Sequence, residues 1–137
     1  MTVTGAKKLQ RQFRKIPKTV EARLVKSVRL NTERTARMAR ALAPVSTGEL
    51  KNWIFTQYEE GGLVGSVEAA PPTKDAQIKA ISVEYGTTDR KTKKTGANRG
   101  STNAAPYMGI ARKHTARKFQ NSVKAAIRKG LKEATSG

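Results

Sequence analysis

The chain has 137 residues, which is enough for one domain with a modest hydrophobic core. It contains no cysteine and a single histidine, which excludes a disulfide scaffold and a thiolate zinc site and leaves little for a transition-metal site. Its 28 Lys and Arg residues against 10 acidic residues give a formal charge of +18, which favours acidic partners, either nucleic acid or protein.

The charge is distributed unevenly along the chain. Residues 1–40 have a net charge of +10, residues 41–88 a net charge of −3 and residues 89–137 a net charge of +11. This segregation favours head-to-tail contact between copies, in which a basic end of one molecule meets the acidic middle of the next. No window approaches the roughly 20 apolar residues of a membrane span. We therefore expect one soluble domain over residues 1–137.

Two helices are predicted in the first third of the chain. Leu9, Phe13 and Ile16 recur at helical spacing and predict a short N-terminal helix that ends before Pro17. A second apolar stripe then continues at steps of three, four or seven residues and predicts a long helix: Val20, Leu24, Val28, Thr35, Met38 and Leu42. Pro44 ends this helix, because proline disfavours helical geometry in the residue before it.

A hairpin is predicted next. Ser46 and Glu49 have the spacing of a capping box, which predicts a brief helical turn around Leu50. Residues 53–58 are β-branched and aromatic, two glutamates and two glycines follow as a turn, and residues 63–68 return as a second strand.

A third strand and a basic loop are predicted after the hairpin. Apolar residues alternate with polar ones in a strand that ends at Gly86: Ile81, Val83 and Tyr85. Residues 88–104 hold no apolar residue larger than alanine, so they cannot anchor themselves to a core, and we expect a flexible basic loop.

The last element is a long C-terminal helix. It is predicted to begin near Pro106 and to bury one apolar face: Ile110, Phe119, Val123, Ile127 and Leu131. The expected fold is therefore α+β, with a short and a long helix, a small antiparallel sheet of three or four strands, and a long C-terminal helix.

Side chains suited to catalysis are sparse. Glu59 with Glu60, and Asp75 with Glu84, are the acidic groups that come near one another in the middle segment, and a solvated role is expected for them. His114 stands among basic residues without a visible partner for general-base work. We expect no catalytic, metal or cofactor residues and no enzymatic activity.

Three short segments, taken together, resemble one family. With their sequences, they are 43–51 (APVSTGELK), 83–87 (VEYGT) and 105–111 (APYMGIA). In this order they resemble the tail-completion or head–tail joining proteins of long-tailed bacteriophages, over residues 5 to 130. Tyr85 and Tyr107 stand where that family has Phe, and Gly109 and Ile110 stand where it has Arg and Pro.

The resemblance implies a structural virion protein. Members of this family form rings, commonly hexameric, where a finished tail meets the capsid connector, with DNA in the lumen. The implied partners are other copies of the chain, a tail terminator or tail tube protein, and a connector or stopper protein. The implied location is the virion, after assembly in the host cytoplasm. Architectural roles are implied for the motif residues: Pro44, Thr47, Gly48, Leu50, Glu84, Tyr85, Gly86, Thr87, Pro106 and Tyr107.

Several roles stay open. The cations of the basic loop are candidates to touch either DNA in the lumen or acidic surfaces of neighbouring subunits: Arg90, Lys91, Lys93, Lys94 and Arg99. At the same head–tail junction, called the neck, the chain fits a tail-terminator or head-closure ring equally well. Outside the class of virion structural proteins, the chain fits a non-specific nucleic-acid-binding protein that uses the basic faces of both long helices.

Overall fold

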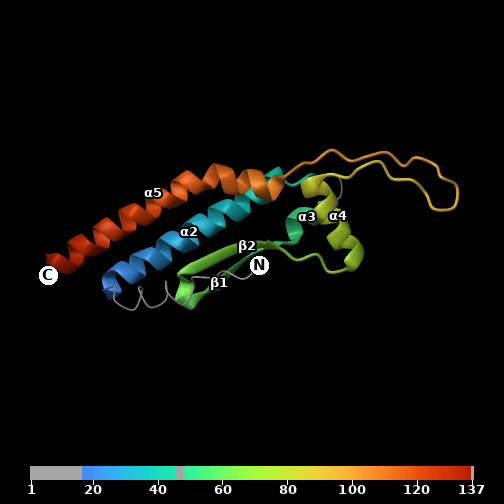
Figure 1. The fold of residues 1–137 in the computed structure, drawn as a ribbon. Helices are drawn as coiled ribbons and strands as arrows, with labels where there is room; N and C mark the ends of the chain where they lie inside the picture. The colour runs from blue at the N-terminus through green and yellow to red at the C-terminus, as the bar shows by residue number, and fades with distance from the viewer. Residues whose placement is uncertain (1–16, 46–47, 137) are drawn as a thin grey trace.

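The computed structural model describes residues 17–45 and 48–136, which form one elongated body (Figure 1). In chain order the elements are α2 (Lys18–Leu42), α3 (Glu49–Asn52), β1 (Ile54–Glu59), the 3₁₀ turn η1 (Glu60–Gly62), β2 (Val64–Ala69), α4 (Lys74–Tyr85) and α5 (Tyr107–Thr135). Long helices are thus combined with an antiparallel sheet, as predicted. The short helix predicted at residues 9–16 lies outside the described residues. No helix within 17–45 and 48–136 has the length and apolar character needed to cross a membrane.

Helix α2 confirms the predicted long helix. It begins directly after Pro17, and Ala43 has left helical geometry with φ −61° and ψ 131°, as expected for the residue before Pro44. The buried face contains apolar residues of the predicted stripe together with small and polar ones: Val20, Leu24, Ser27, Val28, Asn31, Thr32, Ala36 and Ala39.

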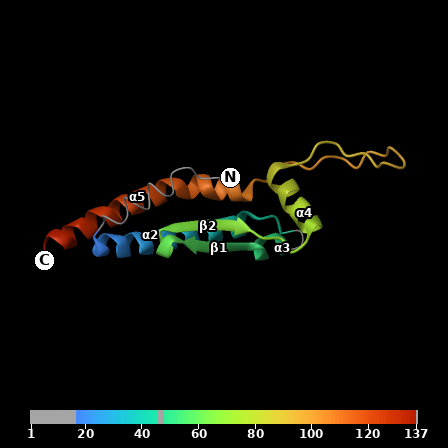
Figure 2. The ribbon, with the colours of Figure 1, turned by 60° about the horizontal axis from the view of Figure 1, so that its bottom comes forward.

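Helix α5 runs antiparallel to α2 along most of its length (Figures 1 and 2). The seam between them is lined with small and hydroxyl-bearing residues. Ser27 and Ser122 share a hydrogen bond of 2.6 Å between their hydroxyl oxygens, and Thr35 and Thr115 share one of 2.8 Å. The buried residues of α5 are Tyr107, Ala111, Thr115, Ala126 and Gly130.

The apolar face predicted for α5 is therefore largely wrong. Ile110, Phe119, Ile127 and Leu131 are 36–47% exposed, and of the predicted set only Val123 packs against a core cluster as a half-buried residue. The physical reason is that small residues let two helix backbones approach closely, whereas large side chains would hold them apart. Large apolar side chains are left on the flanks of the seam.

The predicted hairpin is confirmed by β1 and β2. Phe55 pairs with Glu68 and Glu59 with Val64 in antiparallel register. The inner face packs on α2, where Tyr58 Oη and Thr56 Oγ1 donate hydrogen bonds of 2.8 Å and 2.9 Å to Glu33 Oε1. These two donors, first Tyr58 and then Thr56, hold the pKa of Glu33 below its ordinary value.

The predicted third strand is wrong, because residues 81–85 belong to α4. Thr73 caps this helix at its start, since its Oγ1 accepts a hydrogen bond of 3.2 Å from Ala76 N. Gly86, at φ 75°, ends it. Its exposed apolar residues also fit a helical spacing of three and four: Ile78, Ile81 and Tyr85. Within the described residues the sheet has two strands, not three or four.

Within residues 17–45 and 48–136, most of the buried apolar residues fall into two clusters rather than one continuous core. The larger lies where α2, α3, β1, α4 and α5 meet: Ala36, Ala39, Ala43, Leu50, Ile54, Ala80, Tyr107 and Ala111. The smaller lies toward the start of α2 and the end of α5: Val20, Leu24 and Ala126. Hydroxyls and an amide fill the seam between them, so the contact between α2 and α5 changes from apolar to polar and back again.

Candidate functional site

Residues 87–102, called the basic arm, form a long projection between α4 and α5. Both views show the arm extending from the end of the molecule where α3 and α4 lie, well away from the rest of the chain (Figures 1 and 2). Its side chains are exposed apart from those of Thr87 and Thr92, which are half-buried. This agrees with the sequence argument that the arm has nothing with which to enter a core.

The base of the arm is closed by main-chain hydrogen bonds. Thr87 N donates to Thr102 O at 2.8 Å, and Ala105 N donates to Val83 O at 2.8 Å. Thr102 N in turn donates to Thr87 Oγ1 at 2.9 Å. Gly86 precedes this closure in a left-handed conformation that a side chain would disfavour.

Hydrogen bonds continue to the tip of the arm. Arg90 N donates to Gly100 O at 3.2 Å and Arg99 N donates to Arg90 O. The isolated bridges between Thr87 and Thr102 and between Lys91 and Asn98 keep one antiparallel register along the arm. Thr92 N donates to Ala97 O at 3.0 Å near the tip. The predicted loop is thus an irregular hairpin, and its flexibility stays a prediction.

The five candidate cations all lie on this arm and are all exposed: Arg90, Lys91, Lys93, Lys94 and Arg99. With Asp89, they give residues 87–102 a net charge of +4. None of the five forms an ion pair with another described residue. The ion pairs between described residues join Arg23 to Glu133 and Lys79 to Glu49. The arm therefore presents unneutralised charge to solvent.

The three motif segments meet at the base of the arm. Leu50 of the first segment and Tyr107 of the third are both buried in the larger apolar cluster, each with 3% of its surface exposed. Pro44 is half-buried after α2, and Gly48 precedes α3 at φ 68°. Thr47 and Ser46, and with Ser46 the predicted capping box, lie outside the described residues.

Glu84 of the second segment holds the start of α5. Its Oε1 accepts a hydrogen bond of 2.9 Å from Gly109 N, and its Oε2 accepts one of 3.1 Å from Met108 N. These amides belong to the first turn of α5, where backbone N–H groups lack helical partners and a negative charge is favourable. Burial, and secondarily the charge of Glu84, raises the pKa of Tyr107. Tyr85, by contrast, is 77% exposed.

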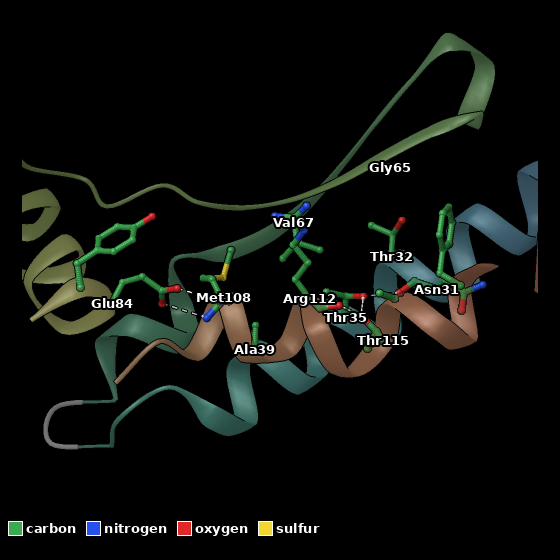
Figure 3. Close-up of a pocket in the computed structure, with 14 residues that line it drawn as sticks. Asn31, Thr32, Thr35, Ala39, Gly65, Val67, Glu84, Met108, Arg112 and Thr115 are labelled. Atoms are coloured by element: carbon green, nitrogen blue, oxygen red, sulfur yellow. Dashed lines mark hydrogen bonds between the residues drawn. The ribbon is translucent and has the colours of Figure 1, made fainter. Parts of the chain in front are cut away.

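A groove with a volume of about 570 Å³ lies between α2, β2, α4 and α5 (Figure 3). Thr35 and Thr115 lie along it, with Val67, Met108 and Phe119 as apolar lining. This groove was not predicted from the sequence. The hydroxyl residues on the buried face of α2 were the one sequence feature that could have indicated the groove. No sequence pattern showed which residues of α5 would face them.

The residues weighed for catalysis are not brought together. Asp75 lies in the first turn of α4 and Glu84 in its last, so the helix separates them. Glu59 and Glu60 are exposed at the hairpin turn, and His114 is exposed on α5. No cluster of three or more metal-ligating side chains is found among residues 17–45 and 48–136.

Comparisons of the chain with models of known protein families, with curated proteins and with solved structures found no match.

Proposed function

We propose that this chain is a structural protein of a long-tailed bacteriophage, forming a ring at the head–tail junction that completes the tail and docks it to the capsid connector. The ring is hexameric in this proposal, with DNA passing through its lumen. Its partners are further copies of the chain, a tail terminator or tail tube protein, and a connector or stopper protein. The binding free energy is spread over wide protein interfaces, and no chemical step takes place.

The observation that carries the proposal is the meeting of the three motif segments at the base of the arm. Leu50 and Tyr107 share one buried cluster, and Glu84 binds the first turn of α5. Their contacts support the view that the three segments form one structural unit.

The distribution of surfaces supports a ring. The basic arm and the turn of the β1–β2 hairpin lie at opposite ends of the molecule (Figures 1 and 2). When two different surfaces of identical copies meet, the contact is heterologous, and repeated heterologous contacts close into a ring if the rotation between copies allows it.

The test is reconstitution of head–tail joining. We expect infected cells lacking this protein to accumulate DNA-filled heads and separate tails, and the purified protein to restore joined, infectious particles in the lysate. Leu50→Asp should fail to restore joining, because it puts a charge into the buried cluster. Val45→Asp in the same motif is the matched control, since Val45 is 74% exposed. Normal joined particles in the absence of the protein would overturn the proposal.

The position within the neck is tested separately. A tail-terminator ring remains on isolated tails, whereas a head-closure ring remains on DNA-filled heads. Immunogold labelling of the two fractions, or electron cryomicroscopy of each, distinguishes these alternatives from a tail-completion ring. Label on tails that carry a separate terminator protein is the expected result.

A second candidate of another class is a non-specific nucleic-acid-binding protein. The unpaired cations of the arm favour it, since exposed Lys and Arg residues attract phosphates. This candidate predicts duplex binding whose affinity falls steeply as salt rises, with no effect on particle assembly. Titration of a fluorescent duplex over a range of salt concentrations, together with the joining assay, separates the two functions.

A further inference from the structure

The outer face of the β1–β2 hairpin, called the outer hairpin face, is open to solvent. Inner-face residues such as Thr56 and Tyr58 contact Glu33 of α2, and side chains of a strand alternate between its two faces. The outward positions are therefore Phe55, Gln57, Glu59, Val64, Ser66 and Glu68. Phe55 and Val64 are 37% and 41% exposed.

This face is acidic in a basic protein. Residues 52–73 contain three glutamates and neither Lys nor Arg, the longest stretch of the chain without a basic residue. Glu59 and Glu68 are exposed, and neither forms an ion pair with another described residue. Ser66 Oγ donates a hydrogen bond of 3.0 Å to Glu68 Oε1, which leaves the charge of this carboxylate unneutralised.

The arm of the same molecule does not lie on this face. The arm projects from the α4 end, whereas the hairpin turn lies toward the start of α2 at the other end, and both views agree on this arrangement (Figures 1 and 2). A contact between the two surfaces consequently needs two molecules.

We propose that the basic arm of one copy docks on the outer hairpin face of a second copy. The inference rests on the proposed ring, and it names the contact by which neighbouring subunits recognise each other. Charge complementarity identifies the occupant, because an arm of net charge +4 meets a face that carries Glu59 and Glu68 and no cation. A second copy carries this acidic surface, whereas docking on nucleic acid would leave the outer hairpin face without a partner.

The dimensions and chemistry of the two surfaces agree. The six residues on each side of the arm, 87–92 and 97–102, span roughly 20 Å when extended, and the six residues of β1 span roughly 20 Å as well. The arm has no apolar side chain larger than alanine. Its lysines and arginines therefore cover Phe55 and Val64 with their aliphatic stems while their charged ends reach Glu59 and Glu68. An arginine over Phe55 adds a cation–π contact.

Charge reversal tests the contact. The arm variant carries Lys91→Glu, Lys93→Glu and Lys94→Glu, and the face variant carries Glu59→Lys and Glu68→Lys. Each is expected to raise the dissociation constant for self-association at least about tenfold in sedimentation velocity runs, and the chain carrying both sets should regain association. The control reverses three exposed lysines of α5 and should associate as the wild type does: Lys113→Glu, Lys118→Glu and Lys124→Glu.

Cross-linking detects the contact even when it is weak. Because the chain has no cysteine, a Lys93→Cys chain mixed with a Glu68→Cys chain can be joined by a bis-maleimide only at the two introduced thiols. We expect mixed dimers from this pair and few from Lys124→Cys mixed with Glu68→Cys. Equal yields from the two pairs, or no dimer from either, would overturn the proposal.

Two further outcomes are distinguishable. If the arm variant loses binding to a short DNA duplex while self-association and cross-linking stay unchanged, the arm binds nucleic acid rather than a second copy, and the proposal is wrong. If cross-linking succeeds but the protein does not restore head–tail joining, the contact stands and the proposed function fails. The purified-protein measurements therefore test the contact independently of the phage.

Discussion

The backbone of Gly130 on α5 lies directly against Val20 on α2. A β-carbon built at position 130 would stand 2.7 Å from Val20 Cα and 2.8 Å from its Cγ2. Contacts that short do not occur in folded proteins, so the helices can approach this closely only because residue 130 has no side chain.

Gly130→Ala should therefore destabilise the protein. In an exposed helix interior, replacing glycine by alanine stabilises by about 1 kcal/mol, whereas here we expect a loss of about 1 to 3 kcal/mol from overpacking. Urea denaturation followed by circular dichroism measures it. Lys129→Ala, at the exposed neighbouring position, should change the unfolding free energy little. A stabilised Gly130→Ala variant would show that α2 and α5 are not in close contact there.

Glu84→Ala should weaken the first turn of α5. The carboxylate accepts hydrogen bonds from Met108 N and Gly109 N, and loss of such a cap costs about 1 to 2 kcal/mol. Glu84→Gln, which keeps an acceptor without the charge, should lose less. Hydrogen exchange measured by NMR should speed up at these two amides in both variants, and an unchanged exchange rate would contradict the capping role.

Gly86→Ala should disturb the base of the basic arm. A β-carbon at residue 86 would lie 2.8 Å from Thr102 O, in addition to the strain of φ +75°. We expect a loss of about 2 to 3 kcal/mol in thermal unfolding. Gly96→Ala is the matched control, because residue 96 also has a positive φ, +63°, but no atom within 4 Å of the added carbon. It should cost only about 1 kcal/mol. Equal losses in the two variants would rule out the contact with Thr102.

Tyr58→Phe should reduce the pH dependence of stability. Glu33 has a lowered pKa in the folded protein, chiefly because Tyr58 donates to it. Its stabilisation is therefore present above the ordinary glutamate pKa of about 4.3 and is lost as the pH falls through the folded value. At neutral pH we expect the variant to lose about 1 to 2 kcal/mol of unfolding free energy. That difference should narrow below about pH 4, as the carboxyl is protonated in both proteins.

Denaturation at a series of pH values measures this effect. Tyr85→Phe is the control, since Tyr85 is 77% exposed, and its stability curve should follow that of the wild type. A constant difference between Tyr58→Phe and wild type across the acidic range would mean that the Tyr58 hydrogen bond does not act through the charge of Glu33.

The parts of the fold that were predicted from the sequence depend on local signals. Pro17 and Pro44 mark the ends of α2 by backbone geometry alone. The two strand-like runs joined by glutamates and glycines indicate the β1–β2 hairpin by a local pattern, although its inner face then packs on α2.

The parts that were wrong depend on tertiary contacts. The pattern of Ile81, Val83 and Tyr85 fits both a strand and one turn of helix. The structure leaves Ile81 and Tyr85 exposed in α4. The assumption that these apolar residues line a buried face therefore could not distinguish a strand from a helix. On α5, the close approach at Gly130 and the hydroxyl pairs with α2 decide which face is buried. A search for large apolar residues overlooks such a seam.

The site was predicted in part, for the same reason. The five arm cations are visible in the sequence as a charge run, but the convergence of Leu50, Glu84 and Tyr107 requires the folded chain. The outer hairpin face was not predicted, because only strand pairing shows that Glu59 and Glu68 lie on the same side of the sheet as Phe55.

The closure of the arm's base has a mechanical consequence. The arm continues directly from α4 on one side and into α5 on the other, and main-chain bonds from Thr87 to Thr102 and from Ala105 to Val83 tie the two sides together. A force applied at the tip is therefore transmitted through the backbone into α4 and α5 together. Replacing the cations at the tip changes which partner the arm binds. The main-chain hydrogen bonds that attach the arm to α4 and α5 stay the same.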